Sequence, residues 1–467
     1  MLWVPLDRKR EISLTSQVYV QLRTQILRGE LSAGEKLPST RGLAAELQVS
    51  RNVILEAYEQ LTAEGYITSR PGAGSYVAEG AFLEQADCIK TDLFYEEKNS
   101  EGNTQHVIDF RSGIPDLTLF PKKIWARLAY DVCCDSSPSV FSYGNPEGRP
   151  ELRHVLSRYL VKTRGVHCRP DQLVITSGAT QALTLAARLL LTAGNSVWME
   201  DPITNDIQTI FTSTGAVIHP VPVDEDGLQT SLITPDLNPQ CIFVTPSHQF
   251  PLGSTLPIQR RIQLIKFARE TGCFIVEDDY DSEFRYEGPP VHSLQGLDPD
   301  RVIYVGSFSK ILSPALRMGY LILPPRLIEQ CRKLKWFSDL HTPSLEQIIL
   351  KRFIEEGYLE RHILKMKKLY KKRRDHLISM LTGYFSGKVR ISGHTTGLHL
   401  IAEFPDMVFT EQLLTKIVHA GVRVYPVEHH AVQKGIHQRK VIIGYGHLQE
   451  EEIEEGIKIL FECLSSE

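Results

Sequence analysis

The sequence lacks the features that mark several classes of protein. No run of about 18 apolar residues occurs in its 467 residues, so we expect no membrane-spanning helix and no membrane partner. A secretory signal is not expected, because the apolar start precedes the basic cluster, which is the reverse order. The eight cysteines form no CxxC pair and show no zinc-like spacing. We therefore predict a cytoplasmic protein with reduced thiols and no metal site.

The sequence also has no excess of basic charge. The net charge is −4, and residues 1–80 contain nine Lys or Arg and nine Asp or Glu residues. Contact with DNA, if any, must therefore depend on where individual cations lie. The length, with 42% hydrophobic and 23% charged residues, predicts a globular protein of two or three domains.

Residues 1–80 are predicted to form one small α+β domain. Apolar residues at helical spacing predict a helix from Leu14 to about Gly29, followed by two helices capped by Ser39 or Thr40 and by Ser50. The inward side chains of the third helix are predicted to be Val53, Ala57, Tyr58 and Leu61. Two short strands, Tyr66–Ser69 and Ser75–Val77, then predict a hairpin with a glycine-rich tip. Helix, helix, turn, helix and hairpin is the order of a winged helix-turn-helix.

In such a domain, the start of the third helix meets base edges and phosphates in the major groove. Arginine and asparagine suit bidentate contacts with guanine and adenine, and the hairpin tip can enter the minor groove. The predicted DNA-binding residues are Arg41, Ser50, Arg51, Asn52, Arg70 and Gly72. The alternative is that each of these arginines is simply solvated.

Residues 13–78 resemble the GntR family of bacterial regulators. The resemblance lies in residues 34–41, 43–44, 49–53, 61–67 and 72–77, which read GEKLPSTR, LA, VSRNV, LTAEGYI and GAGSYV. It implies contact with double-stranded operator DNA through Arg41, Arg51 and the hairpin.

The rest of the chain is predicted to be a linker and a larger α/β domain. Residues 81–106 are polar and acidic without periodicity, which favours a linker. In residues 107–467, strands alternate with helical patterns, which predicts a mainly parallel sheet, and the tail from about 385 predicts a smaller α+β subdomain. The predicted strands are Leu173–Thr176, Ser196–Met199, Cys241–Val244, Phe274–Val276, Val302–Val305 and Tyr320–Leu323.

Several of these strands are followed by residues that suit a pyridoxal phosphate site. Such a site needs a Schiff-base lysine, an acid at the pyridine nitrogen, a donor to the ring oxygen and a phosphate cup. Lys310 is the candidate lysine, Asp278 the acid and Tyr280 the donor. Ser307, Arg317 and the turn 177–181, which opens a predicted helix Ala182–Leu191, can hold the phosphate. A surface lysine and an acidic or metal-binding loop at 277–281 are the alternatives.

Residues from about 107 to 467 resemble fold type I aminotransferases, as found in MocR/GabR-type regulators. The resemblance lies in residues 110–121, 143–148, 152–153, 176–183, 200–202, 245–251, 277–286 and 306–320. It implies a PLP-dependent transferase fold with Lys310 as the catalytic, cofactor-bound lysine, Asp278 at the pyridine nitrogen and Tyr280 at the ring oxygen. Four residues would hold the phosphate through side chains or amides: Ser307, Arg317, Ala179 and Thr180. Tyr143 would reach the phosphate of a neighbouring subunit, which implies a homodimer with exchanged domains, and His248 or Gln249 would lie near the ring.

Two departures from this resemblance bear on function. Ile203-Thr204 stand where related proteins often have Gly-Tyr, and Ile442 stands where an arginine usually binds the substrate carboxylate; Arg439 is a doubtful substitute. Losing such a contact costs about 1.5–3 kcal/mol. The sequence therefore favours a regulator that senses a small amino compound or pyridoxal phosphate itself. The alternative is an active aminotransferase with an accessory DNA-binding module.

The segment Arg361–Arg374 is rich in Lys and Arg. It predicts either a solvated helix face or a surface that follows the DNA backbone.

Overall fold

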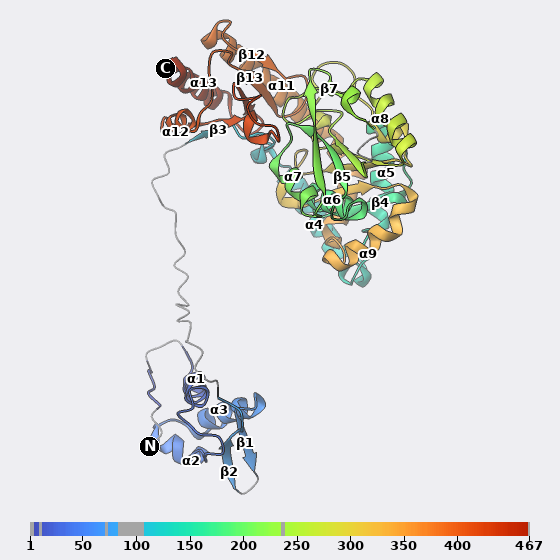
Figure 1. Cartoon of the computed structure of the whole chain (residues 1–467). Coiled ribbons are helices and arrows are strands. Elements are labelled where there is room, and N and C mark those ends of the chain that lie inside the picture. The colour runs from blue at the N-terminus through green and yellow to red at the C-terminus, as the bar shows by residue number, and fades with distance from the viewer. Residues whose placement is uncertain (1–3, 9–11, 71–72, 83–106, 235–238, 466–467) are drawn as a thin grey trace. The chain divides into compact units, whose positions relative to one another are not determined.

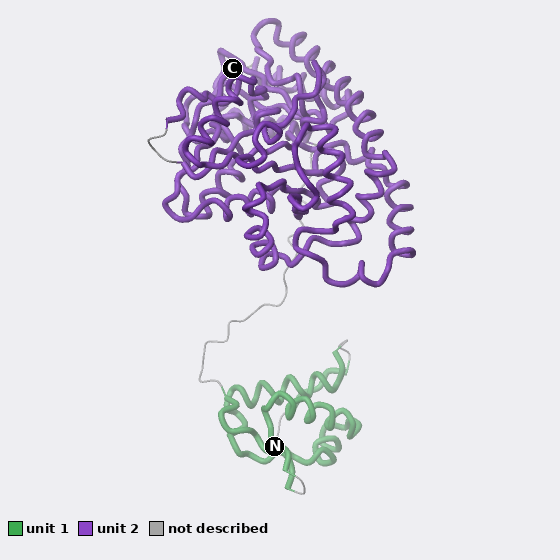
Figure 2. The backbone as a smooth tube through the Cα atoms, turned by 90° about the vertical axis from the view of Figure 1, so that its right-hand side faces the viewer, with its two compact units in different colours: residues 1–102 green, residues 103–467 purple. Residues whose placement is uncertain are grey.

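The computed structural model describes residues 4–8, 12–70, 73–82, 107–234 and 239–465. The chain divides into two compact units, residues 1–102 and 103–467 (Figures 1 and 2). Of the predicted linker, only residues 81 and 82 are described. None of the helices in the described ranges is long and apolar enough to cross a membrane.

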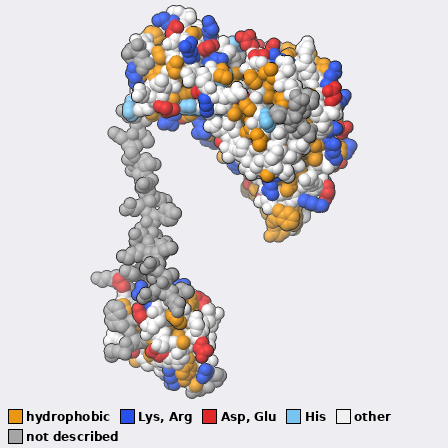
Figure 3. Space-filling model, viewed as in Figure 1, with side chains coloured by type: hydrophobic (Ala, Val, Ile, Leu, Met, Phe, Trp, Pro, Cys, Tyr) orange, Lys and Arg blue, Asp and Glu red, His pale blue; other side chains and the backbone are white. Residues whose placement is uncertain are grey.

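The first unit is a winged helix-turn-helix. Its elements are α1 (Leu14–Leu27), α2 (Thr40–Glu46), α3 (Arg51–Ala63), β1 (Ile67–Arg70) and β2 (Gly74–Val77). The strands pair antiparallel, with Ile67 opposite Val77, and form the wing. On the face of this unit that Figure 3 shows, acidic and basic side chains are interspersed, in keeping with the even charge count.

The caps and core of this unit follow the predicted pattern with two differences. Ser39 is the N-cap of α2, and its Oγ accepts from Gly42 N at 3.1 Å. Ser50 is the N-cap of α3, but its side chain makes no capping hydrogen bond. Ile54, not Val53, is buried with Ala57, because positions 54, 57, 58 and 61 share one helix face.

The second unit is built on an eight-stranded sheet of order β4-β11-β10-β9-β8-β5-β6-β7. Strand β11 runs antiparallel to both neighbours and β7 antiparallel to β6, whereas the other pairs are parallel. The strands are β4 (Leu173–Thr176), β5 (Ser196–Asp201), β6 (Val217–Asp224), β7 (Gly227–Leu228), β8 (Cys241–Val244), β9 (Phe274–Asp279), β10 (Val302–Ser307) and β11 (Gly319–Ile322). The predicted mainly parallel sheet is confirmed.

Helices cover both faces of this sheet, which explains its continuous apolar strands. One face packs against α6 (Ala179–Leu190) and α7 (Asn205–Thr212), with Cys331 of α9 (Ile328–Asp339). The remaining helices around the sheet are α4 (Lys122–Asp135), α5 (Pro150–Arg164), α8 (Ile258–Thr271) and α10 (Ser344–Glu355). Several predicted boundaries were wrong: β9 continues through Asp278 to Asp279, β5 and β10 each run two residues beyond their predicted ends, and α6 begins at Ala179 instead of 182.

The C-terminal part forms the smaller α+β subdomain. Its antiparallel sheet has the order β12-β13-β16-β15, with strands Arg390–Ser392, His399–Glu403, Lys440–Gly444 and Tyr425–Pro426. Its helices are α11 (Tyr358–Phe385), α12 (Glu411–His419) and α13 (Glu450–Ser465). Strand β3 (Ile108–Asp109) pairs in parallel with β14 (Val422–Arg423), so the first residues of the unit join its last subdomain.

The basic segment of α11 is not one charged face. Arg373 is buried and donates to Asp116 Oδ2 and the Gly446 carbonyl at 2.8 and 2.7 Å. Arg374 is also buried, and it pairs with Glu287. Lys372 is exposed and pairs with Glu450. The surface available to a DNA backbone is therefore smaller than the sequence indicated.

The buried pair of Arg373 and Asp116 generates a stability prediction. Arg373→Ala leaves a buried carboxylate without its cation, which we expect to lower the free energy of unfolding by about 3–5 kcal/mol. Lys372→Ala, one position away, breaks an exposed pair and is the matched control, with little change expected. Urea unfolding of both variants measures the difference, and equal midpoints would contradict the structural role of Arg373.

Candidate functional site

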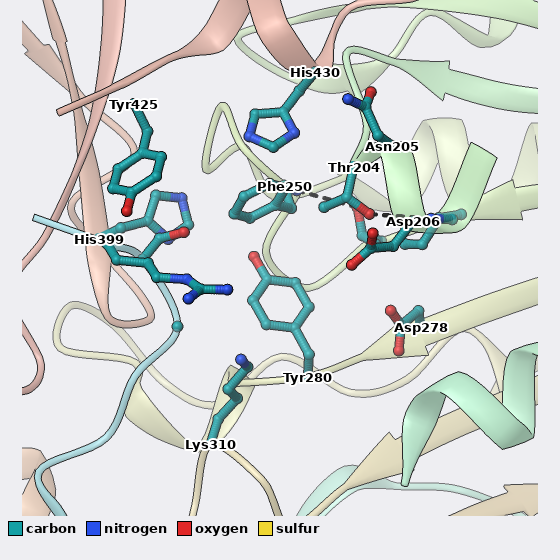
Figure 4. Close-up of a pocket in the computed structure, with 15 residues that line it drawn as sticks. Thr204, Asn205, Asp206, Phe250, Asp278, Tyr280, Lys310, His399, Tyr425 and His430 are labelled. Atoms are coloured by element: carbon teal, nitrogen blue, oxygen red, sulfur yellow. Dashed lines mark hydrogen bonds between the residues drawn. The ribbon is translucent and has the colours of Figure 1, made fainter. Parts of the chain in front are cut away.

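A cavity of about 430 Å³ lies where the carboxyl end of β9 meets the smaller subdomain (Figure 4). This is the edge at which open α/β sheets bind ligands. The lining residues come from β9 and the loops after β8, β9 and β10, from the start of α7, from the smaller subdomain and from the segment after β3. They are Arg111, Ser112, Gly113, Thr204, Asn205, Asp206, Ile207, Thr245, Phe250, Asp278, Tyr280, Lys310, His399, Tyr425 and His430.

Lys310 projects into this cavity (Figure 4) and lies close to Gly113. A Cβ at position 113 would lie 2.8 Å from Lys310 Nζ, and the φ of Gly113 is +70°, so only glycine fits there. Burial lowers the pKa of Lys310; the charge of Asp281 opposes this effect and that of Arg111 adds to it. A lowered pKa favours the neutral amine, which is the nucleophilic form.

Asp278 lies in the wall of the same cavity with 7% of its surface exposed. Its Oδ1 has no hydrogen-bond partner among the described residues. Burial raises the pKa of Asp278 to about 7, and the charges of Asp279 and Asp281 add to this. A buried carboxylate oxygen without a donor is costly, so its place beside a cavity indicates that a ligand supplies the donor.

Tyr280 is held by a short chain of polar contacts. Its hydroxyl lies 3.1 Å from His248 Nδ1, which is 2.8 Å from Asp281 Oδ1. The Tyr280 and His248 rings stack with centroids 5.7 Å apart, so His248 stands behind Tyr280 and does not line the cavity. Gln249 is buried and donates to the Pro202 carbonyl at 2.9 Å, which places it in the wall and not at the cavity surface.

Ligand atoms of His248, Asp281 and His399 lie within 4.8 Å of one another, although sequence spacing gave no sign of such a cluster. Within it, His248 already pairs with Asp281, and His399 Nε2 lies 2.9 Å from the Pro251 carbonyl. These contacts account for the cluster as a hydrogen-bonded support of the cavity wall.

The residues predicted to hold a phosphate meet beside the start of α6. Arg317 donates to the Ser177 carbonyl at 2.7 Å, and Ser309 N donates to Ser307 Oγ at 3.1 Å. A Cβ at Gly319 would lie 2.7 Å from the carbonyl carbon of Gly178, so the segments approach closely. Ala179 and Thr180 are the first two residues of the helix, where amides point outward without helical partners.

Tyr143 lies outside the cavity and is 81% exposed. Its ring contacts His341 edge-on, with centroids 6.3 Å apart. Phe141 and Phe337 are further exposed aromatic side chains of this unit. The predicted position of Tyr143 at a neighbouring subunit's phosphate therefore needs a second chain.

In the first unit, the predicted DNA-binding residues that are described are all exposed. Arg51 and Asn52 open α3, and Arg41 lies in the first turn of α2. Arg70 ends β1 with its guanidinium 5.3 Å from the centroid of the Tyr76 ring. Gly72 lies outside the described residues.

Of the fifteen lining residues, sequence reasoning named only Asp278, Tyr280 and Lys310 as site residues. Phe250 contacts the rings of His399 and His430 with centroids 5.2 and 5.4 Å apart, and it supplies the aromatic surface that Thr204 does not. Thr204 instead caps α7 by accepting from Ile207 N. Ile442 packs with Ile401 and Val427 in an apolar cluster, and Arg439 does not line the cavity.

Comparison with known proteins matches both units. Residues 14–77 match the gntR family of bacterial regulatory proteins, and residues 105–460 match aminotransferase class I and II. The uncharacterized HTH-type transcriptional regulator YhdI of Bacillus subtilis is 36% identical over 97% of this chain and 96% of its own length. The probable rhizopine catabolism regulatory protein MocR of Rhizobium meliloti is 33% identical over 97% and 94%. The kynurenine aminotransferase structure from Pyrococcus horikoshii covers 78% of this chain and 92% of its own, with 29% identity and a TM-score of 0.72.

Fold and comparisons together define a DNA-binding transcription regulator with an aminotransferase-like domain, a fold that implies dependence on pyridoxal phosphate. The chain belongs to the MocR-type regulators of the GntR family.

The raised pKa of Asp278 generates a pH prediction for the cofactor-free protein. Because the folded state keeps the proton up to about pH 7 while the unfolded chain releases it near pH 4, folding stability falls as pH rises through this window. The substitution Asp278→Asn removes the titrating carboxyl and with it this pH-dependent loss of folding stability. We expect its unfolding free energy, relative to wild type, to rise by roughly 1 kcal/mol per pH unit between about pH 4 and 7. Denaturation at several pH values measures it, and a constant difference would show that Asp278 titrates normally.

Proposed function

We propose that this regulator binds pyridoxal phosphate at Lys310 and senses a small amino compound, or the cofactor itself, to alter its binding of operator DNA. The observation that carries this proposal is the unpartnered, buried Asp278 Oδ1, which shares one cavity with Lys310 and Tyr280. A purely structural buried acid has its oxygens satisfied by protein donors, whereas Asp278 Oδ1 has none among the described residues.

The residues fit the cofactor. Asp278 would accept from the protonated pyridine nitrogen, which gives its free oxygen a donor. Tyr280 would donate to the ring oxygen, and Lys310 would attach the cofactor covalently. Ser307, Arg317 and the amides of Ala179 and Thr180 would hold the phosphate. When bound, pyridoxal phosphate supplies an electrophilic centre that captures amines and withdraws electrons from them.

The chain's own residues prepare this site before any ligand arrives. Burial and Arg111 favour the neutral amine of Lys310. The contact of Tyr280 with His248, which Asp281 orients, fixes the position of the Tyr280 hydroxyl. Phe250, with His399 and His430 packed against it, closes the side of the cavity toward the smaller subdomain. These contacts orient a flat ligand and exclude water from it.

A homodimer, with domains exchanged between subunits, is part of the proposal. Gln181 of α6 accepts from Ser177 N and donates to Asp339, which also pairs with the buried Lys335. This network links the start of α6 to the end of α9, which carries the 87% exposed Phe337. A second subunit covering Phe337 and Tyr143 would thus meet the phosphate region directly.

The cofactor assignment is tested with Lys310→Ala. We expect the variant to lack the visible absorbance of a lysine-bound cofactor, because no other lysine is among the described residues that line the cavity. Its DNA affinity should not respond to added pyridoxal phosphate or amines. Lys333→Ala, an exposed lysine outside the cavity, is the control and should behave as wild type.

Wild-type absorbance in Lys310→Ala would show the assignment to be wrong. Sustained turnover of an amino donor by the wild-type protein would favour the aminotransferase alternative.

The DNA-binding half is tested with Arg51→Ala. We expect operator affinity to fall by about tenfold to a hundredfold, with relaxed preference at one base pair, because one bidentate base contact is lost. Arg28→Ala removes an equal charge from the same unit, at a residue already paired with Glu30, and should change affinity little. Fluorescence anisotropy with operator and scrambled DNA gives both affinities. Equal losses in the two variants would mean that Arg51 contributes only general charge.

A further inference from the structure

The cavity wall carries both cationic and acidic side chains. Its lining contains two side chains that are cationic by nature, Arg111 and Lys310, together with the acids Asp206 and Asp278. If Lys310 is consumed in attaching the cofactor, as proposed above, Arg111 is the permanent cation left among the described lining residues. A ligand with a negatively charged group would have to place that group against Arg111.

The other titratable groups of the wall carry no positive charge that would attract an anion. Burial lowers the pKa of His399 to about 3 and that of His430 to about 4, so both imidazoles are neutral near pH 7. Tyr425 donates its hydroxyl to Asp109 at 2.9 Å. Figure 4 draws Asp206 on the opposite side of the cavity from Tyr425, where it repels an anion.

Arg111 is both fixed and available. Its backbone belongs to the segment that continues β3: Phe110 N donates to the Arg423 carbonyl at 3.0 Å, and Gly444 N donates to the Phe110 carbonyl at 2.8 Å. A Cβ at Gly444 would lie 2.2 Å from the Arg111 carbonyl oxygen, so the segment lies directly on β16. No described residue accepts a hydrogen bond from the Arg111 guanidinium or forms an ion pair with it, although the residue is close enough to shift the pKa values of Lys310 and Tyr425.

This position explains how the site can work without an arginine on β16. Ile442 lies on that strand and packs in the apolar cluster with Ile401 and Val427. Arg111 lies beside the same strand, on the segment that packs over Gly444, and its side chain faces the cavity. A guanidinium matches a carboxylate with two parallel hydrogen bonds, which an ammonium or imidazole cannot do.

We infer that Arg111 is the carboxylate anchor of the effector site, and that the effector is therefore a compound with both an amino and a carboxylate group. A plain amine or the cofactor alone leaves Arg111 without a partner. The inference rests on the proposed cofactor site at Lys310, which supplies the point of attachment for the amino group.

The test uses the cofactor-loaded, full-length protein and matched pairs of ligands. L-alanine and β-alanine are each compared with ethylamine, and L-lysine with 1,5-diaminopentane, by titrating the absorbance change of the bound cofactor. In wild type we expect at least one acid to act at about tenfold to a hundredfold lower concentration than its decarboxylated partner. Arg111→Gln should abolish this ratio and Arg111→Lys should retain part of it, while the response to the amines stays measurable.

Arg439→Gln is the matched control, because it removes an exposed arginine next to β16 that does not line the cavity. Arg439→Gln should keep the wild-type ratio between the effective concentrations of each amine and its acid. If no acid acts at lower concentration than its amine in wild type, or if Arg111→Gln keeps the preference, the inference is overturned. Absence of cofactor absorbance in wild type would instead contradict the proposed cofactor site, so the two failures are distinguishable.

Discussion

In β9, the carboxylate of Asp279 accepts hydrogen bonds from the buried guanidinium of Arg164 and, at 2.5 Å, from the hydroxyl of Tyr304. These partners come from α5 and β10, so one buried carboxylate joins three elements. Glu277, two residues earlier on the same side of the strand, accepts from the amides of Leu294 and Gln295. Because side chains alternate along a strand, this anchoring turns Asp278 to the opposite side, into the cavity. A buried pair of this kind adds little net stability, but it determines which way the strand end faces.

Hydrogen bonds from the large sheet also position part of the smaller subdomain on the other side of the cavity. Asp201, at the end of β5, accepts from the amides of Val432 and Gln433, and Ile203 N donates to the His430 carbonyl. The large sheet thus holds the loop that carries His430 through backbone contacts. The cavity is a boundary between two subdomains, and a ligand that touches both walls stabilises one arrangement of them. Regulation requires such a differential interaction, since a ligand bound equally by two arrangements shifts neither.

Sequence reasoning located the residues that follow strands and missed those that depend on distant pairing. Lys310, Asp278 and Tyr280 could be found because strand ends of a parallel sheet converge on one edge, and the local pattern marks each end. Arg111, His399, Tyr425 and His430 come from separate segments, brought together by β3 with β14 and by the β15–β16 pairing. Strands of two residues, such as β3, are too short to show an alternating pattern in the sequence. The burial of Arg373 was invisible for the same reason: its partner, Asp116, lies 257 positions away.

The position of Arg111 in the chain suits the proposed role of this unit as a sensor. In the strand β16, Ile442 contributes to a dry apolar cluster, so an arginine there would have to displace packed side chains. The cation comes instead from Arg111, which lies a few residues after the segment that joins the two units of the chain. A carboxylate held by Arg111 would restrain the part of the second unit from which that segment departs. For a regulator, this would put the ligand contact close along the chain to the segment that leads to its DNA-binding unit.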